Sequence, residues 1–169
     1  MPSRAVSAQA RKQAMATEVE TAEGLVRIRI RLERGAGETG PDEDTVWGEP
    51  LGSDRFRIES CPFFAYGLSR DDVVRAAGEG GPVLDDVLEK SGHRTLRFAL
   101  DPGVSFEAEP VQRLLERVGD TGCTYELLRP RFVAIDVPPE VDLAVLADLL
   151  QGAARKGTLA WEWADPRLS

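Results

Sequence analysis

The fold of the chain is decided by residues 96–137, which read LRFALDPGVSFEAEPVQRLLERVGDTGCTYELLRPRFVAIDV. Residues 96–100 place an apolar side chain at every second position, which is the period of a strand buried on one face. A proline suited to the first turn of a helix then opens residues 110–118, where apolar side chains recur at helical spacing. Residues 124–129 and 132–137 predict two further strands.

The same patterns continue toward the C-terminus. Residues 143–153 have apolar side chains spaced for a second amphipathic helix, and residues 159–163 alternate as a last strand. The predicted order is therefore strand, helix, strand, strand, helix, strand. This order is typical of an antiparallel sheet with two helices on one face, the ferredoxin-like (βαββαβ) arrangement. We expect a ferredoxin-like subdomain over residues 91–165.

The first half of the chain predicts short strands separated by turns. Residues 25–32 read LVRIRIRL, in which apolar side chains alternate with arginines, and residues 45–51 and 55–59 predict a hairpin around a Gly-Ser-Asp turn. A short apolar segment follows at residues 83–88. Such a pattern suits a small barrel, so we expect a β-rich, barrel-like subdomain over residues 18–90 and an α+β fold for the whole chain.

The charge of the chain excludes some partners. The 169 residues include 21 Lys and Arg against 29 Asp and Glu, a net charge of -8. Residues 1–17 contain basic residues and no acid, so we expect a disordered basic leader there and a short tail at residues 166–169. An acidic body repels the phosphate backbone, which argues against nucleic acid as a partner. No apolar run approaches the roughly 18 residues of a membrane span, so we expect no membrane partner.

Cysteine and histidine are scarce, since the chain has Cys61, Cys123 and the single His93. A structural zinc site needs four such ligands, so a conventional zinc site is excluded and we expect no cofactor. Two reduced, buried thiols in the cytoplasm are the simplest interpretation. A thiolate of Cys61 paired with His93 is an alternative, which we rank below a buried Cys61.

Two blocks of the sequence resemble a known family. Residues 62–74, PFFAYGLSRDDVV, and residues 91–97, SGHRTLR, are similar to the signature blocks of DUF4265, an uncharacterised bacterial family catalogued as a domain of unknown function. The resemblance covers roughly residues 25–165. It implies a bacterial, cytoplasmic protein and brings with it no reaction, cofactor or catalytic residue.

His93, at the junction of the two predicted subdomains, is the first candidate site residue because histidine can act as a general base near neutral pH. Such a base needs an orienting acid and a nucleophile or a water. Ser91 and the acid pairs at residues 71–72 and 85–86 are possible neighbours. The plainer interpretation, which we favour, is a structural His93 hydrogen-bonded to a backbone carbonyl at the start of a strand.

The two acid pairs, Asp71-Asp72 and Asp85-Asp86, are candidate ligands of a hard cation such as magnesium. Neighbouring residues of a strand point to opposite faces, however, and each pair lies beside a turn, so we favour solvated turn acids. Residues 69–74, SRDDVV, predict either a capped helical turn or the start of a strand.

An aromatic cluster, Phe63, Phe64 and Tyr66, lies between these features. Aromatic side chains often dominate binding surfaces, so the cluster is a candidate pocket or partner surface. The alternative, favoured by a narrow margin, is that the three rings fill the core between the subdomains.

Arginines at positions 27, 29 and 31 predict a positive stripe on one strand, with Arg94 and Arg97 on a neighbouring strand. Such a ladder can bind carboxylates or phosphates. We expect these arginines to pair with the protein's own acids instead.

Three functions remain open. The leading hypothesis is a non-catalytic binding or regulatory module for an unknown small molecule or protein, with its site at the junction of residues 61–72 and 91–97. The alternatives are a small hydrolase or transferase that uses His93 with a carboxylate, and an acidic, immunity-like antagonist of a basic partner. The sequence leaves the oligomeric state open. The candidate binding residues are Phe63, Phe64, Tyr66, Asp71, Asp72, Ser91, His93, Arg94 and Arg97.

Overall fold

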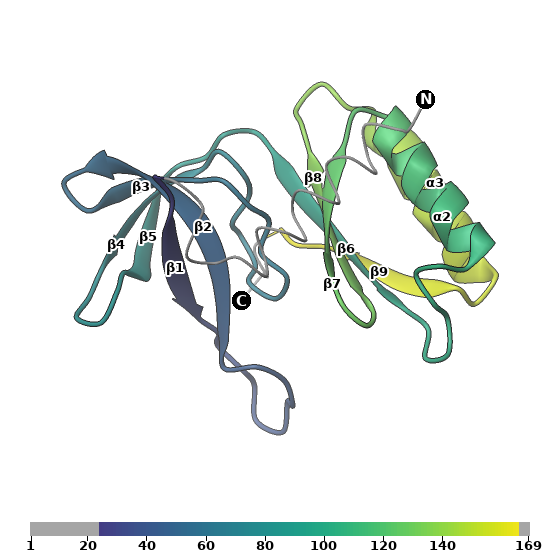
Figure 1. Ribbon diagram of the computed structural model, residues 1–169, viewed down its shortest axis with the longest axis horizontal. Coiled ribbons are helices and arrows are strands. Elements are labelled where there is room, and N and C mark those ends of the chain that lie inside the picture. The colour runs from purple at the N-terminus through teal and green to yellow at the C-terminus, as the bar shows by residue number, and fades with distance from the viewer. Residues whose placement is uncertain (1–23, 166–169) are drawn as a thin grey trace.

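The computed structural model describes residues 24–165, so the expected leader at residues 1–17 and tail at residues 166–169 lie outside the described residues. Figure 1 shows two lobes side by side: a β-barrel, and a sheet covered on its outer side by two helices. The α+β fold class is confirmed, and so is a small barrel in the first half.

The barrel closes through strands that each pair with the next in antiparallel fashion. β1 and β5 complete it in parallel, where Arg29 lies opposite Val83. Ile28 and Ile30 of β1 point into the barrel, as their alternation predicts. Residues 69–74 combine the two interpretations, because residues 69–72 form a turn in which the Ser69 N–H donates to Asp72, and a strand begins at Val73. The strands are β1 (Val26–Arg31), β2 (Glu43–Gly52), β3 (Arg55–Ile58), β4 (Val73–Ala77) and β5 (Val83–Glu89).

Two positions in the barrel, Gly48 and Gly52, favour glycine for different reasons. A Cβ atom on Gly48 of β2 would lie 2.4 Å from the Cδ1 atom of Ile28, closer than real Cβ contacts allow. The β2–β3 hairpin turns through Gly52, Ser53 and Asp54, all of which have positive φ. The glycines therefore permit close packing in one place and a tight turn in the other.

The second lobe is a 4-stranded antiparallel sheet in the order β7-β8-β6-β9, with both helices on one face. The larger hydrophobic core lies between that face and the helices, and includes Leu96, Phe98, Ile135, Leu146 and Leu150. Burial of each such side chain contributes roughly 1.5–3 kcal/mol. The elements are β6 (Arg94–Leu100), α2 (Glu109–Asp120), β7 (Thr124–Leu128), β8 (Phe132–Val137), α3 (Leu143–Arg155) and β9 (Leu159–Trp163).

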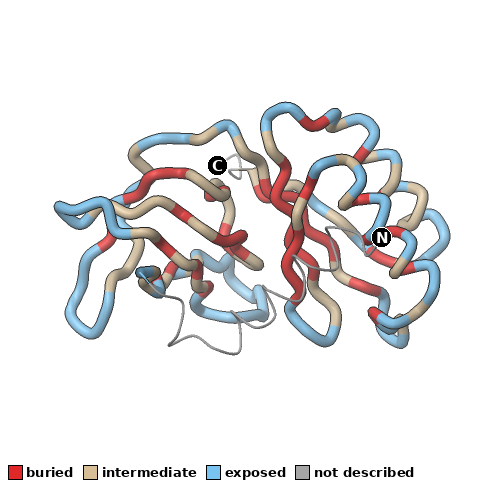
Figure 2. The backbone as a smooth tube through the Cα atoms, turned by 45° about the horizontal axis from the view of Figure 1, so that its top comes forward, coloured by how far each residue is buried: buried red, intermediate tan, exposed pale blue. Residues whose placement is uncertain are grey.

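The opposite side of this sheet, here called the helix-free face, carries small and charged side chains. Arg97 lies opposite Ala134 on one neighbouring strand and Glu162 on the other, so these three side chains share the face. The segment between β3 and β4, residues 59–72, crosses this face and is called the connecting segment. Figure 2 shows buried stretches within each lobe and again where the lobes meet. The buried residues of the helix-free face include the charged Arg97, Glu126 and Asp136.

Candidate functional site

Two buried carboxylates hold the first part of the connecting segment. Glu126 of β7 accepts a hydrogen bond from the backbone N–H of Cys61 at 2.7 Å. Asp44 of β2 accepts hydrogen bonds from the backbone N–H groups of Phe64 and Ala65 at 2.8 and 3.0 Å. Hydrogen bonds to an ionised carboxylate are roughly twice as strong as neutral ones. The segment is therefore fastened to both lobes, since Glu126 belongs to the sheet and Asp44 to the barrel.

The sheet also holds the middle of the connecting segment. Arg97 Nη1 donates a hydrogen bond to the backbone carbonyl of Ala65 at 2.7 Å. The backbone N–H of Gly67 donates to the carbonyl of Ala164, just after β9, at 2.8 Å. Because Arg97 belongs to β6 and Ala164 directly follows β9, the backbone of the segment is also held by the sheet.

The aromatic side chains of the connecting segment line a cavity instead of filling a core. Phe63, Phe64 and Tyr66 are half-buried, and neither hydrophobic core cluster of residues 24–165 contains them. The expectation that they fill the core is wrong, because both lobes bind the backbone of the segment while its rings stay only half-buried. The cavity has a volume of about 330 Å³ and is called the aromatic pocket; its walls include Phe63, Phe64, Tyr66, Arg97, Phe132 and Glu162.

One end of the aromatic pocket is polar. Arg97, whose side chain is only 6% exposed, donates from Nη2 to Glu162 Oε1 at 2.9 Å, and its guanidinium carbon lies 4.6 Å from the centre of the Tyr66 ring. The Tyr66 hydroxyl donates to the other carboxylate oxygen, Glu162 Oε2, at 2.7 Å. The Glu162 side chain is 49% exposed. Its carboxylate is therefore the accessible charge of the pocket.

The floor of the aromatic pocket is formed by small side chains of the sheet. Ala99 of β6 lies directly opposite Ala160 of β9, and both line the cavity. Phe64 and Phe132 form one wall as an edge-to-face pair, with ring centroids 5.6 Å apart. A low floor between aromatic walls suits a planar group.

A second cavity lies on the other side of Phe63 and Phe64, between β2 and β7. Its volume is about 270 Å³. Cys61 lines it and is buried, which confirms the expectation for this thiol. We call this cavity the acidic pocket, since its charged lining residues are Arg27, Glu43, Asp44 and Glu126.

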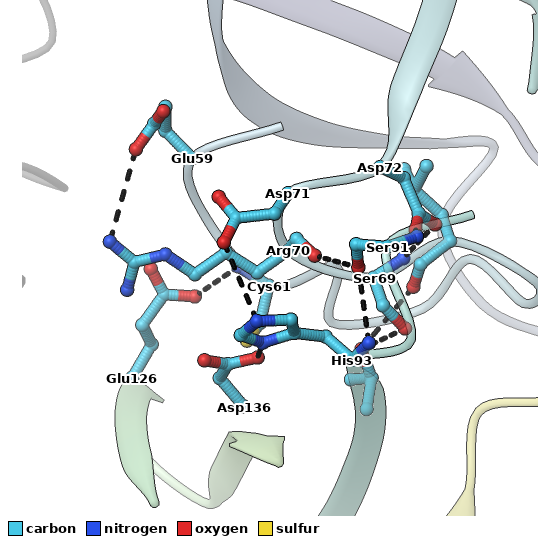
Figure 3. A network of polar contacts seen from close by, with 12 residues as sticks. Glu59, Cys61, Ser69, Arg70, Asp71, Asp72, Ser91, His93, Glu126 and Asp136 are labelled. Atoms are coloured by element: carbon cyan, nitrogen blue, oxygen red, sulfur yellow. Dashed lines mark hydrogen bonds and ion pairs between the residues drawn. The ribbon is translucent and has the colours of Figure 1, made fainter. Parts of the chain in front are cut away.

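His93 lies between two carboxylates at the junction of the lobes (Figure 3). Its Nδ1 is 2.8 Å from Asp136 Oδ1, and its Nε2 is 3.4 Å from Asp71 Oδ2. The expected backbone carbonyl partner is wrong, because both ring nitrogens face carboxylates. Asp136 belongs to β8, whereas Asp71 lies one residue before the end of the connecting segment and has its backbone in the left-handed region, with φ 66. A protonated imidazole can donate to both carboxylates at once, so His93 can join the segment to the sheet.

Asp72 is fully buried, so the expectation that it is a solvated turn acid is wrong. It accepts hydrogen bonds from the backbone N–H groups of Ser69 and Ser91 at 2.9 and 2.8 Å, and from the Lys90 ammonium group at 2.5 Å. These donors precede β4 or follow β5, which explains how a turn residue becomes enclosed. The other acid pair, residues 85–86, is exposed as expected.

The expected arginine stripe is divided between the lobes. The three arginines at positions 27, 29 and 31 lie on β1 of the barrel, whereas Arg94 and Arg97 lie on β6 of the sheet. Their expected placement on neighbouring strands is therefore wrong. The expected pairing with the protein's own acids is confirmed for Arg29 with Glu43, Arg94 with Asp165 and Arg97 with Glu162.

The structure thus separates the candidate residues into groups. One group meets at the aromatic pocket: Phe63, Phe64, Tyr66 and Arg97. A second group meets where the barrel joins the sheet: Asp71, Asp72, Ser91 and His93. Arg94 belongs to neither group and pairs with Asp165.

Three residues of these sites, Phe132, Asp136 and Glu162, are not among the sequence candidates. A signal for Asp136 exists in the sequence, because it is a charged residue between Ile135 and Val137 in an otherwise apolar strand. Its alternation places it on the face opposite the helices.

Comparison with known proteins places the chain in a family. The family model of DUF4265, a domain of unknown function, matches residues 44–161, well over half of the chain. The chain belongs to the DUF4265 family. This confirms the resemblance expected from the sequence. The DUF4265 match spans the connecting segment, His93 and the lining of the aromatic pocket as far as Trp161, and Glu162 follows directly after it.

The DUF4265 protein also resembles a solved structure. A hypothetical protein from Neisseria gonorrhoeae superposes with a TM-score of 0.69 at 16% sequence identity, over 85% of this chain and 96% of that chain. At this identity the likeness shows a shared fold alone. No curated protein matches the chain.

Two kinds of feature are absent from residues 24–165 of this DUF4265 protein. None of the helices there has the length and apolarity needed to cross a membrane. In the same residues, no group of three or more Cys, His, Asp and Glu side chains is arranged to hold a metal ion.

Proposed function

We propose that this protein is a non-catalytic binding module and that the aromatic pocket is its site. The observation that carries the proposal is a connecting segment whose backbone is bound by Glu126, Asp44 and Arg97 while its aromatic side chains remain half-exposed over a cavity. A surface that is already ordered loses little entropy on binding, so it binds more tightly than a flexible one. Aromatic anchors in such pockets supply much of the binding energy.

The fold and the cysteines support a fuller description. We propose a ferredoxin-like lobe over residues 91–165 on the strand order β7-β8-β6-β9, and a barrel-like lobe of which the structure describes residues 24–90. Cys61 and Cys123 are both buried, and burial raises the pKa of the Cys123 thiol. Two buried thiols are in keeping with a protein that works in a reducing compartment such as the cytoplasm.

The proposal is tested with single-ring aromatic probes. Phenol, indole and benzamide are titrated against the ¹⁵N-labelled protein, and the shifts of the backbone amides are followed by NMR. We expect dissociation constants on the order of millimolar for probes of this size, with the shifts concentrated at residues 63–66, 97–99 and 160–162. Phe64→Ala is expected to weaken binding about tenfold.

Leu51→Ala is the matched control, because it removes an exposed apolar side chain from the β2–β3 hairpin and is expected to leave binding unchanged. Shifts that gather outside the aromatic pocket, or a Phe64→Ala protein that binds like Leu51→Ala, would contradict the proposed site.

The His93–Asp136 contact favours a second candidate function, a hydrolase or transferase. A buried carboxylate on Nδ1 orients an imidazole as a general base, and Asp136 is 4% exposed. Nε2 faces Asp71 instead of a hydroxyl or thiol nucleophile, so any base chemistry at this atom would first require Asp71 to move. An enzyme of this kind would hydrolyse p-nitrophenyl acetate and lose about 100-fold or more of that rate in His93→Ala. Equal background rates in the two proteins remove this candidate.

A further inference from the structure

We propose that the aromatic pocket binds the guanidinium group of an arginine side chain presented by a basic partner protein. This inference rests on the proposed function, because it uses the same pocket, and it adds the chemical class of the bound group. Three features of the pocket favour this group: the remaining acceptor sites of Glu162, the shape of the cavity and the charge around it.

The Glu162 carboxylate has room for a second pair of donors. An ionised carboxylate offers about four acceptor sites on its two oxygens. Within the described chain, Oε1 accepts from Arg97 and Oε2 from Tyr66, so each oxygen keeps a further site. Two parallel N–H groups of a planar fork match two oxygens of one carboxylate, and the guanidinium of arginine is the protein group with this geometry.

The pocket is shaped for a flat group. Its floor is the Ala99–Ala160 pair, and one wall is the edge-to-face pair of Phe64 and Phe132. The same site already holds a guanidinium against an aromatic ring, since Arg97 lies over the Tyr66 ring while it donates to Glu162. A second guanidinium against the phenylalanine wall gains cation–π attraction together with the burial of its methylene chain. The volume of about 330 Å³ suits one side chain and is small for an extended ligand.

The surrounding charge favours a cation over an anion. The aromatic and acidic pockets share Phe63 and Phe64, and together they are lined by the carboxylates of Glu43, Asp44, Glu126 and Glu162 against the guanidinium groups of Arg27 and Arg97. The whole chain has a net charge of -8. A negative field of this kind accelerates association with a basic protein and disfavours phosphorylated ligands.

Two isosteric probes separate this inference from the proposed function. Benzamidine carries the two parallel N–H donors and a positive charge, and benzamide has the same shape without the charge. We expect benzamidine to bind the aromatic pocket at least about tenfold more tightly than benzamide in the NMR titration, and its advantage to shrink at high salt. If the two bind equally well, the guanidinium inference is overturned and the binding module stands. If neither shifts the amides of the pocket, both proposals fail.

A second pair of probes tests the arginine side chain itself. N-acetylarginine methylamide and its neutral citrulline analogue differ only in replacing one guanidinium NH₂ by oxygen. We expect the arginine compound to bind and the citrulline compound to bind about tenfold more weakly. Equal binding of the two compounds overturns the inference.

The Glu162→Gln variant tests whether the preference for benzamidine over benzamide arises in the aromatic pocket. Glu162→Gln is expected to abolish the preference for benzamidine over benzamide, whereas the exposed Asp85→Asn removes the same charge elsewhere and is expected to preserve it. A benzamidine preference that survives in Glu162→Gln places the cation outside this pocket and overturns the inference. The comparison of probes on the unaltered protein stands even if Glu162→Gln fails to fold.

Discussion

Tyr125 lies on β7 within the larger core, and its side chain is 1% exposed. Burial, with a smaller contribution from the carboxylate of Glu116, raises the pKa of Tyr125 from 10.0 to about 12. A phenol that is harder to ionise in the folded protein stabilises the fold only while it is neutral in both states. Its contribution is therefore complete below pH 10 and declines as the pH rises toward 12.

We predict that the free energy of unfolding of the unaltered protein falls more steeply than that of Tyr125→Phe between pH 10 and pH 12. The difference between the two curves changes by up to about 3 kcal/mol over this interval, since one pKa unit corresponds to about 1.4 kcal/mol. Urea unfolding at a series of pH values measures it. Other groups that titrate in this range are common to both proteins and cancel in the difference. If the two curves stay parallel, the Tyr125 phenol ionises as readily in the folded protein as in the unfolded chain, which contradicts the prediction.

At the scale of elements, the sequence predicts what depends on local periodicity. The strands near residues 26–31 and 94–100 and the two helices follow from alternating or helical spacing of apolar side chains, and the structure has them with small changes at their ends. Each of these elements buries one face, and the spacing of apolar side chains along the sequence predicts which face is buried. Even the helix-free face is implied by the residues that alternate with the core positions.

Contacts between elements are less visible in the sequence. Asp72 looks like a turn acid because two of its donors, at positions 90 and 91, lie beyond two intervening strands. Phe64 looks like a core residue because nothing in its neighbourhood along the chain shows that Asp44 binds its backbone and leaves its ring outside. The contact between His93, which precedes β6, and Asp136 of β8 is hidden in the same way, because it exists only once these two strands pair. These contacts depend on how elements pack, and one sequence records packing only indirectly.

At the scale of the molecule, residues 90–93 carry the chain from the barrel to the sheet, and two carboxylates hold this crossing in place. Asp72 accepts from Lys90 and Ser91, and Asp136 contacts His93. The crossing and the connecting segment are the two strips of chain where the lobes meet, and Asp72 belongs to one strip and binds the other. The buried carboxylate of Asp72 therefore joins the end of the connecting segment to the start of the crossing.

We predict that Asp72→Ala lowers the free energy of unfolding by about 3 kcal/mol, because it leaves the half-exposed Lys90 ammonium group and the backbone N–H groups of Ser69 and Ser91 without their acceptor. Asp85→Ala, which removes an exposed carboxylate from β5, is expected to change it by less than about 0.5 kcal/mol. Urea unfolding followed by tryptophan fluorescence compares the two variants. A lower slope of free energy against urea in Asp72→Ala is also expected, because lobes that are no longer locked together unfold less cooperatively. If Asp72→Ala matches Asp85→Ala in both quantities, the lobes are held by their apolar contacts and the buried carboxylate is incidental to their arrangement.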